Sequence, residues 1–361
     1  MTVVPGARIL ALAKYGARAA STRQRLLQYV PFLENHGMSV TLRPLLDDTY
    51  LAGLMSGERS SSARILAAYA RRLGDAFAAR DYDAIWVQYE LLPYLPLIDG
   101  VLARIASKPI VYDIDDAIFH MYDAHSSAVV RGLLGGKLRP LMRRAALSLC
   151  GNDYLRDYVV AAGGRASVVP TVVDTADFRP APREPGSPLT VGWIGSPSTW
   201  RYVEPLLPVL LPAMARIGAR FRVVGAGPAA RGIDGIDALE WSEDREVADI
   251  QAMDIGLMPV PDQPWARGKC GYKLIQYMAC GLPGIASPVG VNRTLVQNGI
   301  DGFLVNSEEE WIGALNVLAE DPSRRKAMGE IGRDRMVRHY SLHSQQPAML
   351  DAFRTAMGGR L

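Results

Sequence analysis

Short apolar, β-rich runs alternate with amphipathic helical segments along most of the chain, and this alternation constrains the fold more than any other feature. In the first half the β-rich runs lie at 8–14, 38–46, 84–90, 109–114, 147–152 and 167–173. Helical spacing of apolar residues separates several of them, at 22–36, 60–79 and 97–106. Strands that alternate with helices pair in parallel, because each crossover helix returns the chain to the same end of the sheet. The sequence therefore predicts a doubly wound α/β domain.

The alternation stops once and then restarts. The run 174–188, DTADFRPAPREPGSP, holds four prolines without apolar periodicity and is the best linker candidate. Beyond it, β-rich runs lie at 189–195, 220–227, 238–242, 255–260 and 284–290, and helical segments at 202–217, 308–320, 322–339 and 345–357. We predict an acceptor-side domain at 1–173, a second Rossmann-like domain at 189–340, and a final helix within 341–361 that packs back toward the first domain. Ligands of such folds bind at the carboxyl ends of the strands, so we expect the two sheets to face a common cleft.

Composition excludes several function classes. The 361 residues carry a net charge of only +3, which is too mild for a nucleic-acid binder. The sequence has no apolar stretch of the ~18 residues that a membrane span needs. We predict that the apolar run at 8–14 is a strand rather than part of a signal peptide. Three cysteines, at 150, 270 and 280, lack metal-type spacing and favour a reduced, cytoplasmic compartment.

One local basic cluster lies at 131–144, RGLLGGKLRPLMRR. It holds five basic residues and no acid: Arg131, Lys137, Arg139, Arg143 and Arg144. One interpretation is peripheral contact with the anionic inner-membrane surface. The other, which we favour, is a solvated helix face above an apolar core face. Gly135, Gly136 and Pro140 argue against one long regular helix across the cluster.

The segment 268–292, GKCGYKLIQYMACGLPGIASPVGVN, has the features of a seat for a phosphate or diphosphate. We predict a helix from 271 to 280, with Lys273, Gln276 and Cys280 on its polar face. Unpaired N–H groups and a partial positive charge at a helix start attract anions, and glycines let a ligand approach the backbone. Lys269 and Lys273 add positive charge. The alternative is a capped surface helix with solvated lysines.

The surrounding block carries a resemblance to a known family. Residues 254–305, DIGLMPVPDQPWARGKCGYKLIQYMACGLPGIASPVGVNRTLVQNGIDGFLV, resemble the donor-binding half of a family 4 (group 1) glycosyltransferase. Weaker pieces fall in the expected order: STRQR at 21–25, YDIDDAIF at 112–119, VVPTVVDTADFRP at 168–180 and GWIGSPST at 192–199. The resemblance implies the two-domain GT-B fold and transfer of a sugar from a nucleoside diphosphate donor with retention at the anomeric carbon. It also implies that neither a metal nor another cofactor is needed.

The chain departs from the family's pattern in two places. The usual signature places two glutamates eight residues apart, and here Gly268 and Gln276 stand in those positions. Gln276 can still hydrogen-bond to ribose, whereas Gly268 has no side chain to offer the donor sugar. Ser196 stands where the family has an arginine, and Arg201 is an approximate match for the lysine that follows it.

The resemblance and the residue types together predict a donor site. Its expected members are Gly195, Ser196, Ser198, Thr199, Arg201, Lys269, Cys270, Gly271, Tyr272, Lys273, Gln276, Val289 and Gly290. A leaving nucleoside diphosphate gains negative charge, which amides and lysines stabilise. We infer that the two lysines replace the positive charge missing after the first strand. The alternatives are ordinary: 195–199 as a helix-capping turn, 287–292 as the start of a helix, and each lysine as a solvated charge.

Acidic residues follow a predicted strand of the first domain, in YDIDDAIFHMYD at 112–123. We expect Asp116 and His120 to be catalytic, because a carboxylate can orient a histidine or hold acceptor hydroxyls. The alternative is a capping set of aspartates beside an exposed histidine. Three arginines near the first loop are candidates for binding an anionic acceptor such as a lipid diphosphate: Arg18, Arg23 and Arg25. Arg23 and Arg25 could equally be solvated helix residues.

These observations predict a cytoplasmic, retaining, hexosyltransferase-type enzyme of polysaccharide or glycoconjugate biosynthesis. Its partners would be a nucleotide-sugar donor and a glycan, lipid-linked or small-molecule acceptor, but no nucleic acid, and it would be a monomer or homodimer. One alternative is a nucleotide-sugar binding protein that has lost transfer, as the missing glutamates permit. Another is an epimerase or hydrolase of the same fold.

Overall fold

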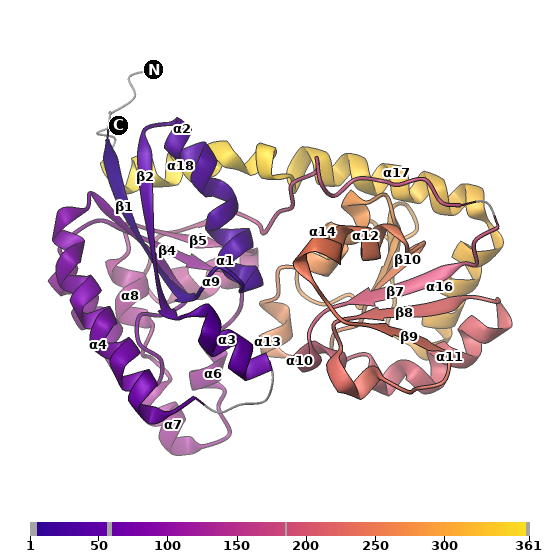
Figure 1. Ribbon diagram of the computed structural model, residues 1–361, viewed down its shortest axis with the longest axis horizontal. Helices are drawn as coiled ribbons and strands as arrows, with labels where there is room; N and C mark the ends of the chain where they lie inside the picture. The colour runs from indigo at the N-terminus through magenta and orange to yellow at the C-terminus, as the bar shows by residue number, and fades with distance from the viewer. Residues whose placement is uncertain (1–5, 56–59, 185, 359–361) are drawn as a thin grey trace. The chain divides into compact units, whose positions relative to one another are not determined.

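The computed structural model describes residues 6–55, 60–184 and 186–358. Contacts divide the chain into two compact units (Figure 1). Unit 1 is built from Met1–Thr171, Gly268–Cys270 and Gln345–Leu361, and unit 2 from Val172–Arg267 and Gly271–Ser344. Residue 185 of the predicted linker and residues 359–361 of the predicted final segment lie outside the described residues. The domain limits at 1–173 and 189–340 remain a proposal.

Unit 1 contains a parallel sheet in which the described strands have the order β2-β1-β3-β4-β5-β6. The strands are β1 Ala7–Tyr15, β2 Met38–Leu46, β3 Ala84–Gln88, β4 Ile110–Ile114, β5 Leu147–Cys150 and β6 Ala166–Val168. Every residue of β3 and β4 is buried, as expected for central strands covered on both faces. β6 is shorter than the predicted run at 167–173, because Pro170 has no N–H group for the sheet ladder.

Helices pack against this sheet and connect its strands (Figure 1). They are α1 Ala20–Arg25, α2 Val30–Asn35, α3 Asp48–Met55, α4 Ser62–Ala78, α5 Ile98–Ala106, α6 His120–Asp123, α7 Ala128–Leu134, α8 Arg139–Arg144 and α9 Asp153–Ala161. The helix predicted at 22–36 is interrupted by a 3₁₀ turn, Leu27–Tyr29, because Pro31 has no N–H group to donate to the carbonyl oxygen of Leu27. The basic cluster is divided between α7 and α8, as its glycines and proline predict.

The last helix, α18 (Leu342–Ala356), begins in unit 2 and continues into unit 1 from Gln345. Its Phe353 packs edge-on against Trp86 of β3, with the ring centroids 5.1 Å apart. Both side chains are fully buried, so α18 completes the core of unit 1. None of the described helices combines the length and the apolar composition needed to cross a membrane.

A buried network of charges lies in unit 1. Glu90 accepts from Lys14 Nζ at 2.9 Å and from Lys137 Nζ at 2.8 Å, and Lys137 Nζ also lies 2.9 Å from Asp99 Oδ2. Burial alone would raise the pKa of Glu90, but the two lysines hold this pKa below its usual value. Lys137 is therefore an internal ion-pair partner, which corrects both the solvated and the membrane interpretation for this member of the basic cluster.

Unit 2 contains a second parallel sheet, whose described strands have the order β12-β11-β10-β7-β8-β9. The strands are β7 Thr190–Ile194, β8 Arg220–Val224, β9 Ile236–Leu239, β10 Ile255–Met258, β11 Gly284–Ala286 and β12 Gly302–Leu304. The helices are α10 Pro197–Trp200, α11 Leu207–Arg216, α12 Glu246–Gln251, α13 Pro264–Arg267, α14 Tyr272–Ala279, α15 Asn292–Leu295, α16 Glu308–Glu320 and α17 Pro322–His339. The two sheets with their flanking helices confirm the predicted doubly wound α/β class.

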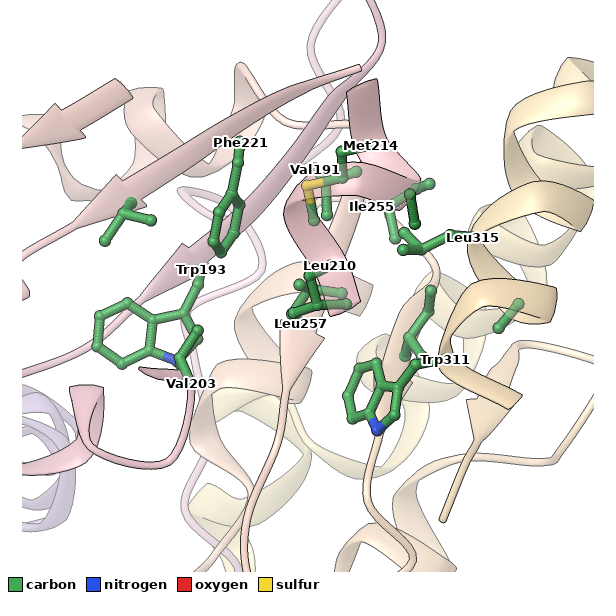
Figure 2. Close-up of a cluster of buried hydrophobic side chains, with 14 of the residues drawn as sticks. Val191, Trp193, Val203, Leu210, Met214, Phe221, Ile255, Leu257, Trp311 and Leu315 are labelled. Atoms are coloured by element: carbon green, nitrogen blue, oxygen red, sulfur yellow. The ribbon is translucent and has the colours of Figure 1, made fainter. Parts of the chain in front are cut away.

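The core of unit 2 joins the sheet to the helices on one of its faces (Figure 2). Trp193 of β7 and Phe221 of β8 belong to the same buried cluster as Leu210 of α11 and Trp311 of α16. Trp193 is 1% exposed, so it is a core residue, as its apolar strand predicts. The cluster anchors β7 and β8, from whose carboxyl ends the candidate site is built.

Candidate active site

Two glycine turns meet at the carboxyl ends of β7 and β8. The Gly195 N–H donates to the Val224 carbonyl oxygen at 3.0 Å. Gly225 has φ +79°, and a Cβ there would lie 2.3 Å from the Gly195 carbonyl oxygen, so a side chain is excluded. A Cβ on Gly195 would lie 2.8 Å from Lys273 Cε. Bare backbone and one lysine therefore share the edge of the sheet at which doubly wound folds bind ligands.

Helix α14 begins beside this edge. Its N-cap, Gly271, has φ +67°, and a Cβ there would lie 2.2 Å from Leu295 Cδ1, so the position requires glycine. Tyr272 and Lys273 form the first turn. Lys273 Nζ lies 5.6 Å from the ring centroid of Trp193, within the range of a cation–π interaction. A helix start and a fixed cation thus lie together, which is the combination expected of an anion seat.

The hydroxyls after β7 make a capping turn. Ser196 caps the four-residue helix α10, and its N–H donates to Thr199 Oγ1 at 3.2 Å. Ser196 Oγ lies 2.9 Å from Ser198 Oγ. Arg201 is exposed, and its Nη2 donates to the hydroxyl of Tyr202 at 3.2 Å. The arrangement has the features of the ordinary capping interpretation, and contact of these residues with a donor stays a prediction.

Gln276 is not on an open polar face of α14. Its side chain is buried, and Nε2 donates to Glu246 Oε1 at 3.0 Å. Trp241 Nε1 donates to the same oxygen at 3.3 Å. Cys280, predicted for the same face, is buried as well. The predicted polar face of α14 is therefore covered by protein beyond its first turn, which corrects the sequence interpretation.

A third glycine turn, after β11, leads into α15. Val289 is buried, and Gly290 has φ +53° with room for no Cβ, since one would lie 2.6 Å from the Arg267 carbonyl oxygen. Asn292 Nδ2 donates to the Ser287 carbonyl oxygen at 3.0 Å, which closes the turn. These contacts agree with the start-of-helix alternative, and donor contact by Val289 and Gly290 stays a prediction.

The segment Gly268–Cys270 interrupts unit 2 and belongs to unit 1. Asn152 Nδ2 donates to the first two carbonyl oxygens of the segment, at 3.0 Å each. The Cys270 thiol donates to the carbonyl oxygen of Asp115 at 2.9 Å, and burial raises the pKa of this thiol well above its usual value. Cys270 thus makes an internal contact, while Lys269 points its Nζ to within 3.6 Å of Asp116 Oδ1.

A steric reason for the missing first glutamate appears at the same place. A Cβ on Gly268 would lie 2.4 Å from the Cβ of Ala117, and 3.1 Å from its backbone nitrogen. Any side chain at this position would need the backbone after β4 to move. The departure from the family signature is therefore built into the packing of unit 1.

Arg25 lies inside unit 1. Its Nε and Nη2 donate to the two carboxylate oxygens of Asp113 at 2.8 and 3.2 Å, and its Nη1 donates to the Val169 carbonyl oxygen at 2.7 Å. Both charged side chains have 0% exposure. Burial alone would lower the pKa of Arg25, but Asp113 raises it above its usual value. This placement does not fit the predicted acceptor role, because every part of the guanidinium is enclosed.

The other two arginines of the first loop remain candidates for the acceptor. Arg18 is exposed, and its backbone N–H donates to Asp48 Oδ1 at 2.9 Å. Arg23 is half-buried, and its Nη1 donates to the Arg18 carbonyl oxygen at 2.7 Å. The loop is thus ordered by its own contacts, and the Arg18 side chain extends from it.

Asp115 and Asp116 follow β4 and differ in environment. Asp115 Oδ1 is buried and accepts no hydrogen bond within the described residues. Burial raises the pKa of Asp115 to about 7, while Arg25 opposes the rise and Asp116 adds to it. Tyr89, which holds a strained φ of 64°, hydrogen-bonds to the same carboxyl group. Asp116 is more open and lies beside Lys269.

The Asp115→Asn variant should show a pH-dependent gain in stability. The pKa of about 7 lies above the ~3.9 of an unfolded aspartate, so between these values the folded protein keeps a proton that the unfolded chain has released. The free energy of unfolding from this group therefore falls as pH rises from about 4 to 7. We expect the melting temperature of the variant, relative to the parent, to rise by a few degrees across that window. A constant difference would show that Asp115 does not titrate there.

His120 bridges two helices of unit 1. Its Nδ1 lies 2.6 Å from Asp123 Oδ1, and its Nε2 lies 2.8 Å from the hydroxyl of Tyr154 on α9. Both ring nitrogens are therefore engaged inside the protein. This placement does not fit proton exchange with a substrate, and it gives His120 a positioning role between α6 and α9.

Two residues of the site were not singled out from the sequence. Asn152 also caps α9, accepting the Leu155 N–H at 3.0 Å, and an asparagine at the end of a β-rich run was the available signal. Glu246 lies in an unremarkable polar stretch between 240 and 249. Its contact with Gln276 depends on how α12 packs near α14, which no local pattern reports.

Comparison with known proteins finds similarity in the second half of the chain. The family model described as glycosyl transferases group 1 matches residues 188–321, which include the three glycine turns, α14 and Glu246. This part of unit 2 is thus similar to group 1 glycosyltransferases. A curated relative, the D-inositol 3-phosphate glycosyltransferase of Rhodococcus jostii (strain RHA1), is 29% identical over 224 residues, which cover 61% of this chain and 45% of the relative. The chain spans about half the length of the curated relatives it matches.

Solved structures resemble nearly the whole chain in fold. Anabaena HepE in complex with UDP-glucose has a TM-score of 0.71 at 17% identity, covering 96% of this chain and 99% of that one. Sucrose-phosphate synthase from Thermosynechococcus elongatus has a TM-score of 0.73 at 15% identity, covering 98% of this chain and 100% of that one. The likeness confirms the predicted GT-B fold with its two Rossmann-like domains.

Proposed function

We propose that the protein is a retaining glycosyltransferase that moves a sugar from a nucleoside diphosphate sugar to a hydroxyl acceptor. One observation carries the proposal: Gly195, Gly225, Lys273 and the start of α14 converge at the carboxyl edge of the unit 2 sheet. These residues fall inside the segment that matches the group 1 model. A fixed cation, a helix start and backbone without side chains are what a diphosphate needs for close approach.

The chemistry follows from the charge of the leaving group. As the bond between the sugar and the diphosphate breaks, negative charge grows on the phosphate oxygens. The positive end of α14 and Lys273 Nζ would stabilise that charge without reorganising, because both are already in place. We propose that these groups do the work a divalent cation does in other transferases, so transfer would be independent of added metal.

Donor and acceptor classes are suggested by the similar proteins. HepE was solved with UDP-glucose, and the curated relatives are named for D-inositol 3-phosphate. We therefore propose a UDP-sugar as the donor and an anionic hydroxyl compound as the acceptor, with Arg18 as its first contact. A cytoplasmic location fits the three cysteines, which are free and buried. The exposed arginines of the basic cluster leave peripheral membrane contact as part of the proposal: Arg131, Arg139, Arg143 and Arg144.

The test measures nucleoside diphosphate release from UDP-, GDP- and ADP-sugars, with and without acceptors that include D-inositol 3-phosphate. Acceptor-dependent release, unchanged by EDTA, with an α-linked product from an α-linked donor, is the expected result. Release without an acceptor would indicate a hydrolase, and a β-linked product would overturn retention. A rise in melting temperature without any release would favour the second candidate, a nucleotide-sugar binding protein, for which the absent carboxylate at Gly268 is the supporting observation.

Asp116→Asn should slow transfer at least about tenfold, a loss of about 1.4 kcal/mol of transition-state stabilisation. Asp116 is the partly exposed carboxylate after β4, beside Lys269, and it belongs to unit 1, whereas Gly195, Gly225 and Lys273 belong to unit 2. A group that acts mainly in the transition state lowers kcat and leaves ground-state affinity unchanged. Steady-state kinetics and UDP calorimetry separate the two effects. Asp153→Asn, an exposed aspartate on α9, is the control, and parental turnover by the Asp116 variant would contradict the prediction.

A further inference from the structure

The carboxylate of Glu246 is held in one orientation by two donors. Gln276 Nε2 donates to Glu246 Oε1 at 3.0 Å, and Trp241 Nε1 donates to the same oxygen at 3.3 Å. Gln276 is itself only 2% exposed, so water does not compete for its amide group, which stays bonded to the carboxylate. The other oxygen, Oε2, has no hydrogen-bond partner among the described residues. One oxygen is therefore fixed by protein while the other stays available.

This carboxylate belongs to the same edge of unit 2 as the anion seat. Trp241 follows β9, next to β8 in the sheet, and a Cβ on Gly225 would lie 3.0 Å from Trp241 Cβ. Gln276 and Lys273 lie on the same helix, one turn apart. Glu246 is half-buried, so a ligand can reach it. If the diphosphate of a nucleotide binds at the start of α14, its nucleoside would lie near β8, β9 and α12.

We infer that Glu246 binds the ribose hydroxyls of the donor nucleotide and that Gln276 positions it; this inference rests on the proposed function. A carboxylate accepts two hydrogen bonds from a vicinal diol, and doubly wound folds use an acidic side chain in this way for ribose. The family signature places a glutamate at position 276. A second carboxylate there would repel Glu246, whereas the amide donates to it. Gln276 thus stands in place of the family's glutamate, and the carboxylate comes instead from Glu246 of α12.

The test compares two ligands that differ only in the ribose diol. Binding of UDP and of 2′,3′-dideoxyuridine diphosphate is measured by calorimetry for the parent, Glu246→Gln and Gln276→Ala. We expect both variants to lose UDP affinity by about tenfold or more, the loss of a hydrogen bond to a charged group, and to bind the dideoxy ligand within about twofold of the parent. Equal losses for the two ligands, or no loss for UDP, would overturn the inference. Glu243→Gln, an exposed acid three residues upstream, is the control and should match the parent.

A double variant guards against a simple failure to fold. Glu246→Gln combined with Gln276→Glu keeps one carboxylate and one amide in the pair but exchanges their positions. We expect this variant to regain most of the preference for UDP over the dideoxy ligand, and a preference as small as that of Glu246→Gln alone would contradict the inference. A parent that binds none of UDP, GDP and ADP overturns the proposed function and the inference with it. A parent that binds UDP without using Glu246 overturns the inference alone.

Discussion

Arg25→Ala should lower the free energy of unfolding by about 3–5 kcal/mol, because it leaves the Asp113 carboxylate as an uncompensated charge in the core of unit 1. Both partners have 0% exposure, so water cannot replace the lost hydrogen bonds. Urea denaturation followed by circular dichroism measures the change. Arg23→Ala, two residues earlier and half-buried, should alter the same quantity by no more than about 0.5 kcal/mol.

A double variant separates the loss of the pair from the loss of packing. Arg25→Met combined with Asp113→Leu replaces a buried pair by apolar groups of similar volume, and such replacements are often neutral or stabilising. We expect it to be more stable than Arg25→Ala. Stability of Arg25→Ala within about 1 kcal/mol of the parent would contradict a buried ion pair at this position.

Lys273→Ala should weaken UDP binding by about 1.5–3 kcal/mol, or roughly 10- to 100-fold, the contribution of a hydrogen bond to a charged group. Lys273 lies along Gly195 and over Trp193, so its charge is fixed at the proposed diphosphate seat. Pyrophosphate should lose affinity in parallel with UDP, because this lysine faces the phosphates. That pattern is the opposite of the ribose-specific loss expected for Glu246→Gln.

The matched control for this lysine is Lys326→Ala on α17, whose side chain is 79% exposed. Calorimetry with both ligands should give parental values for this variant. Unchanged UDP affinity in Lys273→Ala would remove Lys273 from the site and leave the backbone amides at the start of α14 as the remaining anion donors.

The fold was predictable because its signals are local and repeated. Apolar runs of strand length separated by helical periodicity indicate parallel sheets, and the two long helices α16 and α17 begin and end where the sequence predicts. Pro170 and Pro31 shorten or interrupt elements that periodicity alone extends. β12 was not predicted, since its three residues are too few to carry a period.

The site was predictable only where its groups are neighbours in sequence. The glycines and Lys273 around the start of α14 form one local pattern, and the structure places them together. The hydrogen bonds between Arg25 and Asp113, and between Gln276 and Glu246, join residues that are far apart along the chain. A charged or polar residue is predicted from sequence to be exposed to water. A partner that is distant in sequence can instead hold it in the protein interior.

Unit 1 takes part of its core from α18, which follows unit 2 along the chain. Strand β3 supplies Trp86 early, whereas Phe353, which packs on it, is made only after all of unit 2. Domains generally fold in the order of their synthesis on the ribosome. Here that order is reversed, because unit 2 can finish folding before the core of unit 1 is complete. A nascent chain released before α18 is made would expose an apolar face of the unit 1 sheet to solvent.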